Sequence, residues 1–545
     1  MREWTRRQVL KSSIIGTGGL VLASKGVFSL FKKKSASEIP VKLLGPSSSV
    51  AHKLRDGFEF PAPSEFKKTE VLIVGGGISG LSAGWRLQKR GIRDFQILEL
   101  ESEVGGNSRA GKNEVSKFPW GAHYVTLLNE EALYAKEMYR DFGIITGEND
   151  QRAIYNEYYL CQAPHERLYI YQKWQEGLLP KLGVSLDDEI QAKAFFAEVE
   201  KYRYAKGNDG RYAFTIPLEM SSRDPRFLAL DQITMAEFLK RNSWNSKPLN
   251  WYVNYCCRDD FGIPHSQASA WAGLHYFCSR RGQADGVDGS AVLTWPEGNG
   301  WIVGKLREKL GPFIEQDSLA IQIRENGGQV SVDVWNEKSK SVTRWTAQSL
   351  ILAVPRFVST HLAPILKQKQ NEIVQAISYS PWMVANITLR KAPATEAGAA
   401  ISWDNVFYQS DSLGYVVATH QRSAIHTEAT VWTYYKPLDH LEPSLARKQA
   451  YSTTAEDWRA MIIADISKAH PDISDYIESI EVWIWGHAMV RPTPGFIWGQ
   501  ARAEMQKTLG RIHFAHSDMS GISIFEEANF HGVRAADEVI KYDLG

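Results

Sequence analysis

The clearest pattern of hydrophobic and polar positions in this chain lies between residues 71 and 109. Four apolar residues, Val71–Val74, form a run typical of a buried strand and lead into a Gly-x-Gly-x-x-Gly turn. Apolar residues then recur at helical spacing through Leu87, which predicts a helix packed on that strand. A second apolar run, Phe95–Leu98, predicts another strand that ends at the acidic residue Glu99.

Each glycine of the turn has its own expected role. Gly75 permits the tight turn, Gly77 lets the backbone approach a pyrophosphate, and Gly80 lets the helix pack on the strand. The helix N-terminus offers free N–H groups and the positive end of its dipole to phosphates. Glu99 lies 19 residues after Gly80, where a carboxylate can accept hydrogen bonds from a ribose diol. The combined pattern predicts a dinucleotide-binding unit rather than an isolated glycine turn.

The hydrophobic pattern beyond this unit predicts a mixed chain of helices and strands. Residues 130–290 carry helical stretches, and a capping box opens the predicted helix Met235–Arg241. Strands with a glycine turn are expected within 320–355. Residues 510–540 predict a strand, a loop and a closing helix.

Composition narrows the function classes. A length of 545 residues predicts two or more domains, and a net charge of +1 with no basic face argues against a nucleic-acid partner. The 18 tryptophans fit either a large aromatic core or an aromatic-lined cavity. No zinc-type spacing of cysteine and histidine occurs, so no metal site is expected, and disulfide formation is left open. The four cysteines are Cys161, Cys256, Cys257 and Cys278.

The N-terminus resembles a twin-arginine export signal. Thr5-Arg6-Arg7-x-Val9-Leu10-Lys11 precedes a moderately apolar stretch, and residues 1–35 form the predicted signal segment. The expected location is therefore the periplasm, with the twin-arginine translocase as a transient partner. No clean cleavage site follows, so the segment is either removed or kept as an N-terminal anchor. Residues 36–68 are polar with scattered prolines and predict a linker.

Four separated motifs occur in order along the chain. They are the dinucleotide unit with Val104-Gly105-Gly106, Pro296–Gly300, Leu352–Pro355, and the segment from Gly510 to Ala536. In content and order these motifs resemble those of the FAD-dependent amine oxidase superfamily, which includes monoamine and polyamine oxidases, protoporphyrinogen oxidase and phytoene desaturase relatives. The resemblance implies an α/β fold in which a Rossmann-type FAD/NAD(P)-binding domain carries an inserted α+β substrate domain. The implied FAD-binding stretches are 69–128, 291–362 and 481–545, and the substrate-domain stretches are 129–290 and 363–480.

The resemblance also assigns residues to the cofactor. These are Gly75, Gly77 and Gly80 at the pyrophosphate, Glu99 at the adenosine ribose, Gly106 and Arg109 beside the phosphates, Asp518 on the far side of FAD, and Glu527 and Ala528 where the last helix begins near the flavin. Arg109 is either a phosphate-neutralising residue or a solvated loop residue. No cysteine lies near the C-terminus, so the implied FAD is bound non-covalently.

Two departures from the family pattern bear on catalysis. Asn107 stands where an arginine is common, and Asn386 stands where many amine oxidases have a lysine near flavin N5. The catalytic residues are therefore left unknown, with four candidates: Trp485, for which core packing is the alternative role, His487, Phe496 and Asn386. The same choice between ligand contact and packing or solvation is open for His123, Trp483, Arg491 and His531.

Three functions remain open at this point. The first is an exported FAD-dependent oxidoreductase that transfers hydride from an amine to flavin N5, with oxygen, a quinone or another carrier as electron acceptor. The second is an FAD-dependent desaturase or isomerase of a hydrophobic substrate, and the third is a non-catalytic flavin-binding protein. Acidic residues facing the flavin favour the first, an apolar tunnel favours the second, and a cavity filled by side chains favours the third.

Overall fold

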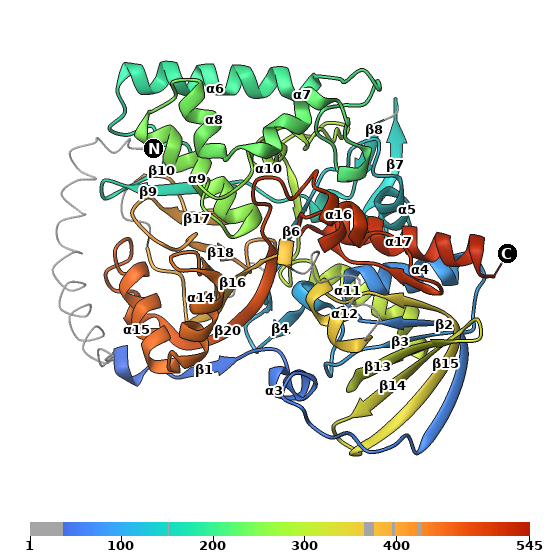
Figure 1. The fold of residues 1–545 in the computed structure, drawn as a ribbon. Coiled ribbons are helices and arrows are strands. Elements are labelled where there is room, and N and C mark those ends of the chain that lie inside the picture. The colour runs from blue at the N-terminus through green and yellow to red at the C-terminus, as the bar shows by residue number, and fades with distance from the viewer. Residues whose placement is uncertain (1–35, 151, 364–374, 395–397, 423–427, 545) are drawn as a thin grey trace, which may run out of the picture.

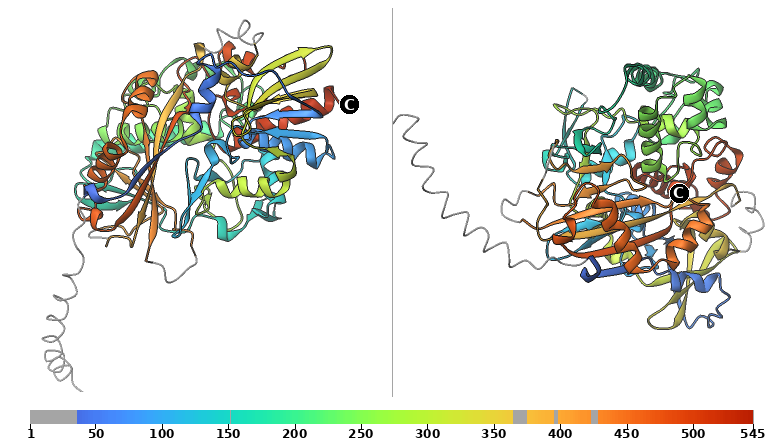
Figure 2. Two further views of the ribbon diagram at one scale, coloured as in Figure 1. Left: turned by 90° about the horizontal axis from the view of Figure 1, so that it is seen from below. Right: turned by 90° about the vertical axis from the view of Figure 1, so that its left-hand side faces the viewer.

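The computed structural model describes residues 36–150, 152–363, 375–394, 398–422 and 428–544. The predicted export signal lies outside these residues. Two large β-sheets organise the molecule, with a helical layer above them in the view of Figure 1. The sheet that contains the dinucleotide-binding unit lies to one side, and the second sheet lies beside it (Figures 1 and 2).

The first sheet has seven strands and confirms the predicted strand–turn–helix–strand unit. Its order is β12-β3-β2-β15-β14-β13, with β21 beside β15, and β12, β3, β2, β15 and β21 run parallel. The antiparallel strands β13, β14 and β15 form a meander at one edge. The strands are β2 (Glu65–Val74), β3 (Phe95–Leu98), β12 (Ile314–Glu315), β13 (Ser318–Asn326), β14 (Gln329–Asn336), β15 (Ser341–Leu352) and β21 (Ile512–Phe514).

Helices from distant parts of the sequence complete this Rossmann-like domain. The C-terminal helix α17 packs along α4, and Gly532 allows the contact because a Cβ there would lie 2.2 Å from the backbone oxygen of Ser79. Val71, Ile73 and Val533 are fully buried in the shared core. The helices are α4 (Ile78–Lys89), α5 (Leu133–Asp141), α11 (Gly300–Leu310), α12 (Arg356–Leu362), α16 (Gln500–Met505) and α17 (Phe525–Tyr542).

The second sheet has eight strands in the order β1-β20-β16-β19-β18-β17-β9-β10. Its central strand β16 is buried at almost every position because both faces are covered. Helices α14 (Pro443–Ser452) and α15 (Ala455–Ile466) lie against the sheet. The strands are β1 (Val41–Leu44), β9 (Glu166–Ile170), β10 (Lys173–Glu176), β16 (Tyr379–Leu389), β17 (Asp404–Phe407), β18 (Tyr415–Val417), β19 (Thr430–Pro437) and β20 (Ile477–Val490).

Helices of the helical layer have the boundaries that local sequence signals indicate. Helix α8 spans Met235–Arg241 as predicted, and the Thr234 side chain accepts a hydrogen bond from the Glu237 N–H. The other helices of the layer are α6 (Leu186–Tyr204), α7 (Pro225–Leu228), α9 (Lys247–Phe261) and α10 (Ala270–Cys278). Smaller pieces are α3 (Ser48–Ala51), β4 (Ala110–Lys112), β5 (Lys117–Pro119), β6 (Tyr124–Thr126), β7 (Ile145–Asn149), β8 (Arg152–Tyr155) and β11 (Val292–Thr294).

Two stretches of the expected domain plan extend into other parts of the fold. The expected linker 36–68 contains β1, which pairs in parallel with β20, and its last residues begin β2. Residues 481–490, expected with the last FAD-binding stretch, belong to β20 of the second sheet. All four cysteine thiols are free and buried. Among the described residues no helix is both long and apolar enough to cross a membrane.

Candidate cofactor and substrate site

The turn Gly75–Gly80, here called the glycine cradle, is closely packed at Gly75 and Gly80 and open at Gly77. A Cβ at Gly80 would lie 1.8 Å from the Gly75 carbonyl oxygen, and a Cβ at Gly75 would lie 2.5 Å from the Ala353 oxygen. Gly75 also has a φ of +108°, a conformation that favours glycine. A Cβ at Gly77 would meet nothing within 4 Å. Gly77 therefore faces open space at the start of α4, where a pyrophosphate can approach the helix N-terminus.

Glu99 is oriented by backbone donors at the end of β3. Its Oε2 accepts a hydrogen bond from the Gly76 N–H at 2.7 Å, and its Oε1 accepts one from the Glu101 N–H at 2.9 Å. Burial raises the pKa of Glu99 above its usual value. Each carboxylate oxygen retains a further lone pair, so the group can still accept hydrogen bonds from a ribose.

The second glycine pair lies against the first turn. The Gly105 N–H donates to the Gly76 oxygen at 2.8 Å, and both Gly105 and Gly106 have positive φ. Arg109 follows this loop and forms an ion pair with Glu101 at 3.1 Å. The structure thus brings together Gly75, Gly77, Gly80, Glu99, Gly106 and Arg109.

Asp518 joins three elements of the protein. Its buried carboxylate accepts hydrogen bonds from the Arg356 N–H at 2.9 Å and from the Tyr379 hydroxyl at 2.5 Å. The His516 ring lies 3.0 Å from the other carboxylate oxygen, and these partners lower the pKa of Asp518 despite the opposing effect of burial. The carboxylate therefore anchors the start of α12 and of β16 beside the dinucleotide-binding domain.

The first residues of α17 point in different directions. Glu526 lines a cavity, whereas Glu527 accepts hydrogen bonds from the Leu218 N–H at 2.7 Å and from the Ser520 hydroxyl. Burial raises the pKa of Glu527 to about 8. The Ala528 oxygen accepts from the Ser79 hydroxyl at 2.9 Å, which ties α17 to α4. Glu527 and Ala528 therefore hold the helix in place, and Glu526 faces the cavity.

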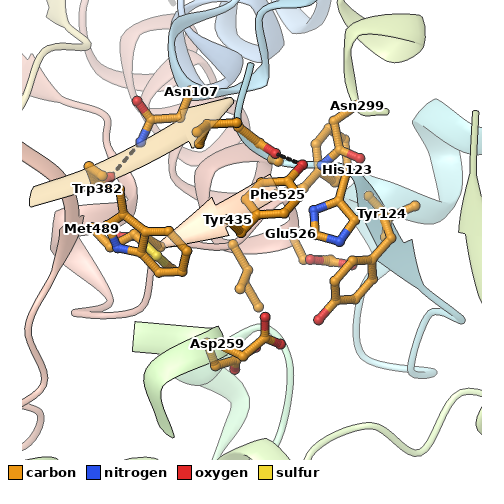
Figure 3. Close-up of a pocket in the computed structure, with 18 of the residues that line it drawn as sticks. Asn107, His123, Tyr124, Asp259, Asn299, Trp382, Tyr435, Met489, Phe525 and Glu526 are labelled. Atoms are coloured by element: carbon orange, nitrogen blue, oxygen red, sulfur yellow. Dashed lines mark hydrogen bonds between the residues drawn. The ribbon is translucent and has the colours of Figure 1, made fainter. Parts of the chain in front are cut away.

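The cavity is lined by the second sheet, by α9 of the helical layer, and by loops and the first turn of α17 in the dinucleotide-binding domain (Figure 3). Its wall combines aromatic rings with acidic side chains. The wall includes Asn107, His123, Tyr124, Asp259, Asp260, Arg280, Asn299, Trp382, Tyr435, Trp485, Met489, Phe525 and Glu526.

Aromatic side chains form one part of the wall. The His123 ring lies 4.7 Å from the Tyr435 ring, and burial lowers the pKa of His123 to about 4, so the imidazole is neutral near pH 7. The Trp485 indole N–H donates to the Trp120 oxygen at 2.7 Å while its ring borders the cavity. The Oδ1 atom of Asn299 is buried at the same wall without a hydrogen-bond partner among the described residues.

Acidic side chains form the other part of the wall. Asp260 is paired with Arg280 at 2.6 Å, which neutralises both charges. Asp259, on α9, and Glu526 form no ion pair among the described residues and face the same space (Figure 3). Burial, followed by the charge of Asp260, raises the pKa of Asp259 to about 7. Glu526 accepts two hydrogen bonds from Thr126, at 3.2 and 3.3 Å, and burial raises its pKa as well.

Several sequence-derived candidates lie away from this cavity. Asn386 is buried on β16, where its side chain donates to the Pro119 oxygen at 3.0 Å and accepts from the Thr433 hydroxyl at 2.7 Å. Trp382, on the same face of the strand, lines the cavity instead. His487 stacks on the Phe357 ring at a centroid distance of 4.3 Å. The cavity wall also excludes Phe496, Trp483, Arg491 and His531.

These other candidates have protein partners. Phe496 is buried in the hydrophobic core, and the Trp483 ring lies 5.0 Å from the Trp120 ring. Arg491 donates to the Gln267 side chain, and the His531 ring lies 2.8 Å from the Ser520 hydroxyl.

Sequence reasoning missed Asp259, Asp260, Arg280 and Glu526. Glu526 stands beside the predicted Glu527, and the pair at the helix start was the only local signal for it. Asp259 and Asp260 stand in a helical pattern where acidic residues commonly face solvent. No group of three or more metal-ligating side chains occurs among the described residues.

Comparisons with known proteins agree with this geometry. The family of NAD(P)-binding Rossmann-like domains matches residues 73–142. The chain is 23% identical over 324 residues to the flavin-containing amine oxidase B of Sus scrofa, and the match covers 57% of this chain and 55% of that relative. The matched stretch thus spans about half the length of this relative.

Solved structures with the same fold cover more of the chain. Wild-type putrescine oxidase bound to putrescine gives a TM-score of 0.65 at 14% identity, covering 87% of this chain and 99% of that one. A fatty acid isomerase from P. acnes gives a TM-score of 0.58 at 17% identity, covering 87% and 98%. The class defined by the fold is therefore a mixed α/β protein with a Rossmann-like dinucleotide-binding domain. Its architecture is that of the amine oxidase structures, with a second sheet inserted between the stretches of that domain.

Proposed function

We propose that this protein is an FAD-dependent oxidoreductase that dehydrogenates an amine. The observation that carries the proposal is the pair Asp259 and Glu526, two carboxylates without ion-pair partners among the described residues, in an aromatic cavity beside the dinucleotide cradle. Two unpaired carboxylates in one enclosed site favour a cationic ligand, because an opposite charge offsets the cost of keeping them ionised there.

The residues of the cradle fit the phosphates and the ribose of FAD. Gly77 leaves open the space that a pyrophosphate needs, Glu99 keeps lone pairs for a ribose, and Arg109 supplies a positive charge close by. The isoalloxazine ring would then extend toward the cavity, where the unpartnered Asn299 oxygen is a ready acceptor for a ring N–H. Bound FAD supplies the two-electron acceptor that the oxidation requires.

Different cavity residues would contact an amine in different ways. Asp259 and Glu526 attract the ammonium form, and the rings of Tyr435 and Trp382 offer faces for cation–π contact. Because a C–H bond next to nitrogen is oxidised from the neutral amine, the ammonium must first lose a proton. The Asp259 carboxylate, with a pKa of about 7, is suited to accept it near neutral pH.

A hydrophobic substrate is the second candidate, because the fold is also that of a fatty acid isomerase. A carboxylate ligand would meet like charges at Asp259 and Glu526, which disfavours this class. The open cavity also disfavours a non-catalytic role, for which side chains would fill the site.

The test is an anaerobic titration of the FAD-loaded protein with a panel of primary, secondary and diamine substrates. Loss of the oxidised flavin absorbance with an amine is the expected result, and admission of air then separates an oxidase from a dehydrogenase that uses a quinone or another carrier. Bound FAD that no amine reduces, but that an unsaturated fatty acid perturbs, would overturn the amine proposal in favour of the second candidate. A chain that takes up no FAD would overturn both.

We also propose that the protein is exported to the periplasm by the twin-arginine translocase, on the support of Arg6 and Arg7 and the residues around them. Cell fractionation tests this proposal. The wild-type chain is expected in the periplasmic or membrane fraction, and a variant with Arg6→Lys and Arg7→Lys is expected to stay in the cytoplasm. Equal distribution of the two chains would contradict export by this route.

A further inference from the structure

The segment that precedes β2 crosses from the second sheet to the dinucleotide-binding domain. At its start, Val41–Leu44 pairs in parallel with residues 480–483 of β20. The chain then forms the short helix α3, passes along the edge of the first sheet and enters β2 at Glu65 (Figures 1 and 2). This course places α3 between the two parts of the molecule.

The centre of the segment is bonded to the cofactor cradle. The Ser47 N–H donates to Glu101 Oε1 at 2.7 Å, and the Ser47 hydroxyl donates to Glu101 Oε2 at 3.0 Å. The same carboxylate forms the ion pair with Arg109 at 3.1 Å, and the Glu101 N–H donates to Glu99. Ser47 therefore contacts Glu101, which in turn contacts the residues assigned to the ribose and the phosphates, Glu99 and Arg109.

The later part of the segment rests on the meander of the first sheet. Val50, Leu54 and Phe60 pack against a small buried cluster formed by Leu319, Trp335 and Val342. Lys53 forms an ion pair with Glu337 at 2.5 Å, and neither side chain is fully exposed. The segment is thus fixed at β1, at Ser47 and at this cluster.

We propose that residues 41–54 form a strap that retains the bound dinucleotide, with the Ser47–Glu101 contact as its latch. The proposal rests on the proposed binding of FAD. Ser47 fixes the Glu101 carboxylate with two donors, and Glu101 in turn holds the Arg109 guanidinium beside the glycine cradle. Ser47 and Glu101 are positioning residues: they keep Arg109 and Glu99 in place and tie the strap across the cofactor's binding domain.

The Ser47→Ala variant tests the latch. It removes the hydroxyl donor to a carboxylate, and Ser47 gives α3 no side-chain cap, so the helix loses no capping bond. FAD is expected to dissociate about tenfold faster, as expected for the loss of one charge-assisted hydrogen bond. The rate is followed as the recovery of flavin fluorescence after dilution of the loaded protein. Ser47→Thr keeps the hydroxyl and is expected to restore the wild-type rate.

Ser49→Ala is the matched control, because this exposed serine lies in the same helix. Its FAD dissociation rate and the melting temperature of its FAD-free form are both expected to equal those of the wild type. Leu54→Ala loosens the strap at the buried cluster without touching Glu101, and it is also expected to accelerate FAD loss.

The possible results distinguish failure of the strap proposal from failure of the proposed FAD binding. FAD that binds and leaves at one rate from the wild-type, Ser47→Ala and Leu54→Ala proteins overturns the strap and leaves the FAD proposal standing. Faster loss in Ser47→Ala that Ser47→Thr does not restore assigns the effect to something other than the hydroxyl and also overturns it. A wild-type chain that binds no FAD overturns both.

Discussion

Replacing Gly77 with alanine is expected to abolish tight FAD binding while leaving the FAD-free protein folded. The added Cβ meets no protein atom within 4 Å, and Gly77 has an extended backbone with φ −74° that alanine adopts. The methyl group would occupy the space that the pyrophosphate needs. We expect FAD affinity to fall by at least about 100-fold, or roughly 2.7 kcal/mol, measured by fluorescence titration of the FAD-free protein.

Two other glycines make this prediction specific. Gly311→Ala, at the exposed end of α11, also places its Cβ in open space and is expected to leave FAD affinity unchanged. Gly80→Ala would place its Cβ 1.8 Å from the Gly75 oxygen, so this variant is expected to destabilise the FAD-free domain itself. FAD affinity that survives in Gly77→Ala would mean that the phosphates lie elsewhere.

Replacing Asp259 with asparagine is expected to lower kcat/KM for an amine by about 100-fold. Asparagine keeps the shape of the side chain but removes the charge, and truncating a buried charge contact typically costs 2–5 kcal/mol. Stopped-flow reduction of the flavin at several amine concentrations measures the effect. The exposed Asp187 of α6 provides the control, and Asp187→Asn is expected to react like the wild type.

The raised pKa of Asp259 also predicts that kcat/KM depends on pH. Wild-type kcat/KM is expected to fall as pH decreases through about 7, because Asp259 takes up a proton and loses its attraction for the ammonium group. This limb of the profile is expected to be absent in Asp259→Asn. A wild-type profile that is flat between pH 6 and pH 8, or a variant that keeps the limb, would contradict the assignment.

The Asp259→Asn substitution is expected to raise the stability of the folded protein although it lowers the activity. The pKa of Asp259 is raised in the folded protein from 3.8 to about 7, so the unfolded chain holds the ionised form more easily. The resulting cost is absent below pH 4, grows between pH 4 and pH 7, and has an upper bound of about 4 kcal/mol above pH 7. Asp259→Asn is therefore expected to melt at a higher temperature than the wild type at pH 8 in the FAD-free state. Lower activity together with higher stability excludes misfolding as the cause.

Local sequence was sufficient where neighbouring residues determine the structure. The strand–turn–helix–strand unit is confirmed with β3 at Phe95–Leu98, because each of its elements carries its own apolar period and its own glycine turn. The boundaries of α8 are confirmed because a single capping residue, Thr234, sets its start. The α/β class follows from these elements and is also confirmed.

The cavity depends on contacts that no local pattern contains. Asp259 faces the cavity because the end of α9 lies against β16, where the Ser380 hydroxyl donates to the Phe261 oxygen, whereas the sequence of α9 alone permits an exposed acid. Asn386 and Trp382 share one face of β16, yet of the two only Asn386 donates a hydrogen bond to the Pro119 oxygen. The pairing of β1 with β20 joins residues more than 400 positions apart, so a polar segment with prolines gave no sign of it.

The closing elements of the dinucleotide-binding domain have a consequence for biosynthesis. Strand β21 and helix α17 come late in the sequence: β21 pairs with β15 in the middle of the chain, and α17 packs on α4 near its start. Because a chain is made from its N-terminus, the cradle of Gly75–Gly80 lacks its supporting helix until Phe525–Tyr542 has been synthesised. A chain truncated before Phe525 is therefore expected to remain without cofactor.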